Sequence, residues 1–166
     1  MKKILLVLMA MFALGFQNVN AQDGIKIVTN HPDFKIKVKR CAASGKTVII
    51  DFILTNEGAN DVENMFGCGG GGHHGGANSE AYDDEGNIYK GGNLQVKVAN
   101  SDHYSSYSSG NFNIPVGVPM KYSVKIDGVP QSAESIARLK MFFFHDGWGL
   151  GWDKPVRISN IPISRN

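Results

Sequence analysis

Three side chains that commonly bind metals lie within one glycine-rich stretch, CGGGGHHGGAN. Seven of the ten residues from 67 to 76 are glycine, and the other three are Cys68, His73 and His74. A thiolate and two imidazoles can bind zinc, copper or nickel. The spacing is unfavourable, because adjacent histidines have difficulty reaching one ion together and structural zinc sites separate their ligands by about two to five residues.

The alternative interpretation of this stretch is a surface insertion. So many glycines leave few side chains to pack, and a long loop is tolerated at small energetic cost. We therefore predict that residues 67–76 are disordered or poorly packed and carry no tightly bound metal, and that the protein uses no cofactor. Deleting residues 69–76 should then leave thermal stability nearly unchanged.

Two other segments combine aromatic side chains with small residues. The stretch SDHYSSYSSGNF contains Tyr104 and Tyr107, and a mixture of tyrosine, serine and glycine is typical of binding loops. The stretch FFFHDGWGLGWDKP contains Trp148 and Trp152, which can stack on sugar rings or anchor a protein partner. Each segment alone also has a structural explanation, as a solvated linker in the first case and as a cap over the core in the second.

Sequence motifs of catalysis are missing. The chain has no G-x-S-x-G, H-E-x-x-H, C-x-x-C or phosphate-binding loop, and we predict that it is not an enzyme. The acidic stretch DDEGN (83–87) lacks the alternating acids and the distal glutamate of a calcium loop. We interpret it as a hairpin turn in which Gly86 supplies the turn geometry.

The first 21 residues have the pattern of a secretory signal peptide. Lys2 and Lys3 form a positive start, residues 4–16 are apolar, and small residues precede Gln22. We predict cleavage after Ala21 and a periplasmic or extracellular location, with residues 22–166 forming one domain. No later run is long and apolar enough for a membrane helix.

The charge balance argues against binding to nucleic acid. The chain has 17 basic and 15 acidic residues, and removal of Lys2 and Lys3 with the signal peptide would leave the two signs equal. A neutral domain has no general attraction for nucleic acid or for an anionic membrane. The two cysteines, Cys41 and Cys68, are compatible either with a disulfide in an oxidising compartment or with two free thiols.

Hydrophobic alternation predicts an all-β fold. In FKIKVKRC, Phe34 and Val38 alternate with lysines, and in MKYSVKID, Tyr122 and Val124 alternate with polar residues, which is the period of a half-buried strand. KTVIIDFILTN (46–56) is β-branched on both faces and should lie centrally, whereas Pro162 indicates an edge strand. The expected strands are 34–41, 46–56, 79–83, 87–99, 119–127, 137–144 and 155–163.

About seven short strands separated by turns favour an antiparallel Ig-like β-sandwich, with an up-and-down barrel as the second choice. The stretches VKRCAASGKTVIIDFILTNEGANDV, AYDDEGNIY, IDGVPQSAESIARLKM and RISNIPI resemble small secreted Ig-like domains of bacterial envelope proteins, of the unknown-function or immunoprotective-extracellular-like type. The resemblance implies the sandwich and export, and it carries over no functional residues.

Successive connections of antiparallel strands lie at alternate ends of a sandwich. The expected connections 57–78, 100–118 and 145–154, which hold the unusual segments, should therefore share one end, opposite the short turns at Ser44 and Glu85. This coincidence favours an exported, non-catalytic module that binds an unknown protein or glycan through these three loops. The alternatives are a metal protein centred on Cys68, His73 and His74, or a purely structural envelope module.

Overall fold

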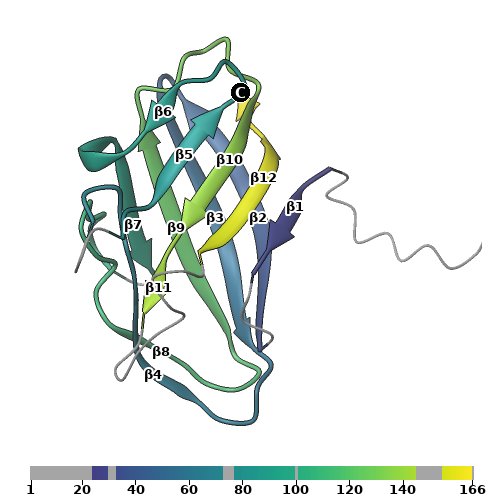
Figure 1. Cartoon of the computed structure of the whole chain (residues 1–166), viewed down its shortest axis with the longest axis vertical. Helices are drawn as coiled ribbons and strands as arrows, with labels where there is room; N and C mark the ends of the chain where they lie inside the picture. The colour runs from purple at the N-terminus through teal and green to yellow at the C-terminus, as the bar shows by residue number, and fades with distance from the viewer. Residues whose placement is uncertain (1–23, 30–32, 73–76, 100, 145–154, 166) are drawn as a thin grey trace, which may run out of the picture.

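A computed structural model describes residues 24–29, 33–72, 77–99, 101–144 and 155–165 (Figure 1). The described residues form β-strands and one short 3-10 turn, so the protein is all-β, as the alternation predicted. The strands are β1 (Lys26–Val28), β2 (Phe34–Ser44), β3 (Thr47–Asn56), β4 (Val62–Gly67), β5 (Glu80–Asp83), β6 (Ile88–Tyr89), β7 (Leu94–Val98), β8 (Phe112–Ile114), β9 (Pro119–Asp127), β10 (Ser135–Met141), β11 (Phe143–Phe144), β12 (Val156–Pro162) and β13 (Ser164–Arg165), with the 3-10 turn η2 (Gly91–Asn93) between β6 and β7.

The strands of the described residues form three sheets. Sheet 1 has the order β1-β12-β10-β5-β6, sheet 2 has the order β13-β2-β3-β9-β7, and sheet 3 has the order β11-β4-β8. Among the described residues, every strand pairing is antiparallel except that of β13 with β2. None of the described segments forms a helix of the length and hydrophobicity needed to cross a bilayer.

Sheets 1 and 2 contribute their inward side chains to one core. In β3, Val48, Ile50 and Phe52 are completely buried, and the alternate residues point away from the core. Sheet 1 adds large buried residues from β10 and β12, including Ile136 and Ile158. Burial of such side chains contributes about 1.5–3 kcal/mol each, which explains why the alternation in the sequence predicted the inward faces correctly. The central position expected for residues 46–56 is also correct, since β3 lies between β2 and β9.

The single strand expected over residues 87–99 is wrong. Its two halves, β6 and β7, are separated by η2 and belong to different sheets. β6 pairs with β5 in sheet 1, and β7 pairs with β9 in sheet 2. The chain changes direction at Gly91, whose φ of 60° lies in the left-handed region that favours glycine.

The expected loops 57–78 and 100–118 are also not entirely loops. They contain β4 and β8, which pair with each other, and β4 also pairs with β11. The signal in the sequence is weak because these strands are short and irregular. The β4–β8 register shifts between Val62 and Met65, around Asn64, whose φ is 52°.

The edge position expected for residues 155–163 is wrong as well. β1, which the alternation did not predict, pairs with β12 on the side away from β10. That pairing reaches only Arg157 to Ser159, so Pro162 lies beyond it, and the missing proline amide removes no hydrogen bond to β1.

Candidate binding surface

The described part of the glycine-rich stretch, residues 67–72, is packed against the rest of the protein. Five consecutive amides donate hydrogen bonds to other segments, namely Gly67 to Ser109 Oγ (2.9 Å), Cys68 to the Phe142 carbonyl (2.9 Å), Gly69 to Tyr107 (2.9 Å), Gly70 to Leu94 (2.8 Å) and Gly71 to Ser106 (2.7 Å). Only Gly71 in this segment is exposed. The expectation of a poorly packed insertion is therefore wrong for residues 67–72, and residues 73–76 lie outside the described residues.

Glycine is required at positions 69 and 70 because the backbone there lies directly against the backbone of other segments. A β-carbon on Gly69 would clash with the Ser106 carbonyl, and one on Gly70 would lie 2.7 Å from the Gly91 carbonyl oxygen. Contacts this short do not occur for real side chains, and a backbone obstacle cannot rotate away. The glycines thus allow two pairs of backbone segments to pack closely, which composition alone did not reveal.

The metal ligands proposed from the sequence are only partly described. Cys68 is 1% exposed and belongs to a small apolar cluster with Ala77, Phe142 and Phe144, while His73 and His74 lie outside the described residues. Among the described residues, no three His, Cys, Asp or Glu side chains gather in a way that could hold an ion. Both cysteines are free thiols, and Cys41 lies in the main core rather than beside Cys68.

The tyrosine–serine segment, residues 101–111, runs between β7 and the glycine-rich segment. Ser105 and Val96 exchange two backbone hydrogen bonds of 2.9 and 2.8 Å, so the segment extends the edge of sheet 2. On its other side, Ser108 forms a bridge with Cys68. The hydroxyl of Ser105 also accepts hydrogen bonds from the amides of Tyr107 and Ser108, each at 3.2 Å. The segment, for which a solvated linker was one explanation from composition, is therefore bonded to β7 on one side and to the glycine-rich segment on the other.

The two tyrosines of this segment have different environments. Tyr107 is 66% exposed, whereas Tyr104 is half-buried and its ring lies below the Lys97 ammonium, 5.0 Å from the ring centre. Burial raises the pKa of the Tyr104 phenol, and the Asp51 charge raises it further, while a hydrogen bond with Ser123 partly opposes both. Tyr104 therefore lies over the outer face of sheet 2.

This position differs from the expectation that Tyr104 lies at one end of the strands. The Ser105–Val96 pairing places the segment beside the middle of β7. The short connections do lie together at one end (Figure 1), where the Val129 amide donates to the Lys46 carbonyl at 2.9 Å. Trp148 and Trp152 lie outside the described residues.

A polar network on the outer face of sheet 2 was not identified from the sequence. Asp51, in the middle of β3, accepts hydrogen bonds from Arg40 Nε at 3.0 Å and Ser123 Oγ at 2.6 Å. Arg40 Nη2 lies 2.9 Å and Lys121 Nζ 3.7 Å from the same carboxylate. The sequence did contain a signal for this network, because Asp51 is the one charged residue within the apolar run VIIDFIL.

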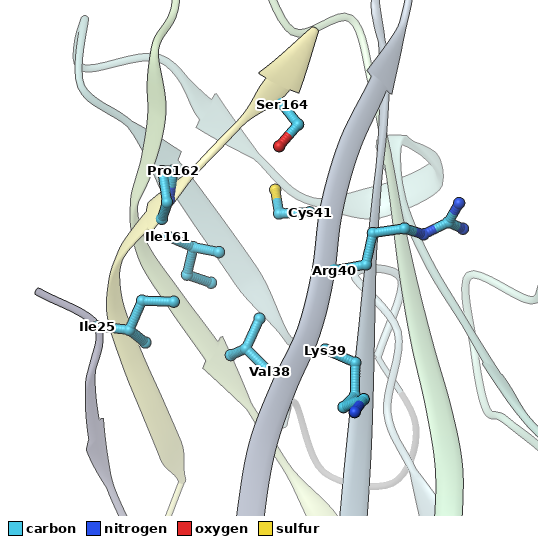
Figure 2. Close-up of a pocket in the computed structure, with 8 residues that line it drawn as sticks. All are labelled: Ile25, Val38, Lys39, Arg40, Cys41, Ile161, Pro162 and Ser164. Atoms are coloured by element: carbon cyan, nitrogen blue, oxygen red, sulfur yellow. The ribbon is translucent and has the colours of Figure 1, made fainter. Parts of the chain in front are cut away.

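A cavity of about 190 Å³ opens between β2 and β12 (Figure 2). Ile25, Val38 and Ile161 form its apolar wall, and the thiol of Cys41 points into it. Burial raises the pKa of this thiol to about 12, although the Arg165 charge opposes the shift. A thiol that stays protonated is a poor nucleophile, so the surroundings of Cys41 do not activate it for nucleophilic attack.

The hairpin interpretation of DDEGN agrees with the contacts of Asp83. Its carboxylate accepts hydrogen bonds from the Glu85 and Asn87 amides at 3.1 and 2.8 Å and from the Tyr89 hydroxyl at 2.6 Å. Burial alone would raise the pKa of Asp83, but these hydrogen bonds together lower it. The carboxylate thus organises the turn between β5 and β6 and is already satisfied by protein donors.

The sequence matches no protein-family model, and no curated protein matches it. A similar solved structure is that of a family 123 glycoside hydrolase from Clostridium perfringens, studied for glycolipid glycan hydrolysis. The two share 12% identity with a TM-score of 0.39, and the alignment covers 75% of this chain and 22% of that one. The chain therefore spans less than a quarter of that protein's length.

Proposed function

We propose that the protein is an exported, non-catalytic binding module that recognises a protein or glycan ligand of the cell envelope. Its fold would be an Ig-like β-sandwich of the type found in small secreted envelope domains. The inward faces of sheets 1 and 2, which share one core, support the sandwich. The signal-peptide pattern of the first 21 residues supports export to the periplasm or beyond.

The observation that carries this proposal is a solvent-exposed tyrosine on a backbone that is hydrogen-bonded to neighbouring segments. Tyr107 is 66% exposed, yet its carbonyl accepts the Gly69 amide and its own amide donates to Ser105 Oγ. An aromatic side chain on a backbone already held in place loses little conformational entropy on binding. Tyr104, on the same segment, extends this surface toward sheet 2. We call the exposed side of residues 104–107 the tyrosine surface.

Absence of catalysis is part of this proposal. The thiol of Cys41, which points into the cavity of Figure 2, has a raised pKa, and Asp51 and Asp83 are engaged by protein donors. These groups support structure rather than proton transfer or nucleophilic attack.

A glycan array tests the tyrosine surface. Purified mature protein should bind a subset of arrayed glycans, and both Tyr104→Ala and Tyr107→Ala should weaken that signal. Tyr82→Ala is the matched control, because Tyr82 is a partly buried tyrosine of β5 in sheet 1 and should leave binding unchanged. Equal binding by all three variants, with thermal unfolding unchanged, would contradict the proposed surface.

Export has its own test. The mass of the protein recovered from the producing cell should correspond to a chain that begins at Gln22. A product that keeps Met1 would contradict export through a cleaved signal peptide.

A further inference from the structure

The outer face of sheet 2 is strongly cationic, although the predicted mature chain is neutral. Residues that lie directly opposite each other in an antiparallel sheet point to the same side, so the register defines this face. We call it the cationic face, and its basic residues are Lys35, Lys37 and Arg40 on β2, Lys121 and Lys125 on β9, and Lys97 on β7.

Among the described residues, this face has fewer carboxylates than cations, and the most central of them, Asp51, is buried. Asp51 has a side chain only 10% exposed, whereas its partners Arg40 and Lys121 are 58% and 54% exposed. Asp127 pairs with Lys125 at 3.0 Å, and Glu57 pairs with Lys35 at the margin of the face at 3.2 Å. Within the described residues, Lys37 has no carboxylate partner. The field that reaches solvent is therefore positive.

The cations of β2 and β9 form two columns on either side of the central strand β3, whose outward residues include Ile49, Asp51 and Ile53. Lys37 on β2 and Lys121 on β9 both lie opposite Ile53 of the central strand β3. Because neighbouring strands are about 4.8 Å apart, these two lysines originate roughly 10 Å from each other. Two outward rows further along the strand, beyond the row of Asp51, Ile49 lies between Ala42 and Lys125. Half-buried isoleucines thus lie on both sides of the Asp51 carboxylate between the two columns.

The tyrosine surface continues the cationic face at the β7 edge. Lys97 belongs to the face and also lies over the Tyr104 ring, at 5.0 Å from its centre. Tyr107, two residues further along, is exposed. A ligand that crosses from β2 to this edge would therefore meet the cations of β2, the isoleucines of β3, the cations of β9 and then the aromatic rings.

We propose that an anionic polysaccharide, bearing carboxylate or sulfate groups, binds across the cationic face and ends on the tyrosine surface. Its charged substituents would meet Lys37 of β2 and then Lys121 of β9, and the C–H face of the ring between them would lie over Ile53. The exposed ring of Tyr107 offers a face on which a sugar ring can stack, and this favours a glycan over an acidic peptide. This inference rests on the proposed binding function and specifies its ligand class.

The test compares polymers that differ in one property. Dextran sulfate is the probe, dextran is the same backbone without charge, and polyglutamate is an anion without sugar rings. Binding of each to immobilised full-length mature protein should be measured at several salt concentrations. We expect dextran sulfate to bind at least about tenfold more tightly than dextran or polyglutamate, with affinity that falls as salt rises.

Charge reversal locates the site. The double variant Lys37→Glu/Lys121→Glu should weaken dextran sulfate binding by about tenfold or more and reduce its salt dependence. The control is Arg138→Glu/Arg157→Glu, which changes the same number of charges on sheet 1 and should have little effect. Thermal unfolding of both variants checks that each is folded, and Lys37→Gln/Lys121→Gln provides a milder substitution if the reversal is unstable.

Three outcomes would overturn the inference: equal binding of dextran and dextran sulfate, equal binding of polyglutamate and dextran sulfate, or equal effects of the two reversals. Failure here is distinct from failure of the proposed function. If Tyr107→Ala weakens binding to neutral glycans while the Lys37/Lys121 reversal has no effect on any probe, the binding module stands and the anionic ligand is wrong.

Discussion

Gly70 and Gly91, which are 21 positions apart in the sequence, touch through their backbones. The Gly91 amide donates a hydrogen bond of 2.8 Å to the Gly70 carbonyl, and a β-carbon on Gly70 would lie 2.7 Å from the Gly91 carbonyl oxygen. The Gly70 amide is also used, in a hydrogen bond of 2.8 Å to the Leu94 carbonyl. This contact joins the glycine-rich segment to the turn where the chain leaves sheet 1 for sheet 2.

Replacing Gly70 by alanine should therefore destabilise the protein. The added methyl group forces two backbone segments apart, and overpacking of this kind costs about 2 kcal/mol in the free energy of unfolding. Gly92→Ala is the control, because no atom lies within 4 Å of a β-carbon there, and its stability should stay the same or rise slightly. Urea denaturation measures both variants. Equal stability of the two would refute close packing at Gly70.

Deletion of residues 69–72 should be more damaging still. The deletion removes the hydrogen bonds of the Gly69, Gly70 and Gly71 amides and uncovers the tyrosine–serine segment. We expect a fall in the melting temperature of at least about 10 °C, since losses of several kcal/mol shift it by that much in a domain of this size. This is the reverse of the expectation from composition. A melting temperature within a degree or two of the wild type would restore the interpretation as an insertion.

Asp51 should be more important for stability than the exposed ion pair on the same face. Asp51→Asn removes the charge that accepts hydrogen bonds from Arg40 and Ser123, and we expect a loss of about 2 kcal/mol. Glu57→Gln breaks the exposed pair with Lys35 and should cost less than about 0.5 kcal/mol. Measuring the free energy of unfolding of both variants tests this order. A larger loss for Glu57→Gln than for Asp51→Asn would argue against a structural role for Asp51.

Asp83 should make the stability of the folded protein depend on pH in acidic solution. Its pKa in the folded protein lies below the ordinary value of 3.8, so the folded state binds a proton less readily than the unfolded chain. Its contribution is complete above that value and is lost as pH falls through the lower, folded pKa. Unfolding measured from pH 7 down to strongly acidic conditions should show this loss. Asp83→Asn should lower the free energy of unfolding at neutral pH and make it depend less on pH in acidic solution. Glu85→Gln, at an exposed position, should do neither.

Cys41 should have the opposite dependence at alkaline pH. Burial raises the pKa of its thiol from 9.0 to about 12, so between these values the unfolded chain has lost a proton that the folded protein keeps. Stability should therefore fall as pH rises through this range. Cys41→Ala should reduce that slope. Reaction of the native protein with a thiol reagent at pH 8 should be slow, and rapid modification of Cys41 without unfolding would contradict its burial.

Local pattern in the sequence was sufficient to predict much of the core. The alternation around Tyr122 and Val124, and the apolar run around Phe52, identified inward residues correctly because side-chain period is a property of the strand itself. Strand partners are not local. Residues 87–99 are hydrophobic enough for one strand, but the left-handed turn at Gly91 sends β6 and β7 into different sheets. Short strands such as β4 and β8 have too few residues for a recognisable period.

The candidate site shows the same division. The sequence by itself determined that Tyr104 and Tyr107 lie in a segment with the composition of a binding loop, and that lysines alternate along β2 and β9. Only the tertiary structure decided that β3 separates these lysines into two columns, that Asp51 lies beneath the cations, and that the glycines support the tyrosine segment. The physical reason is that composition records how freely a backbone can move, whereas close packing depends on which distant segment it meets. A glycine run is flexible when nothing lies beside it, and here its backbone lies against Ser106 and Gly91.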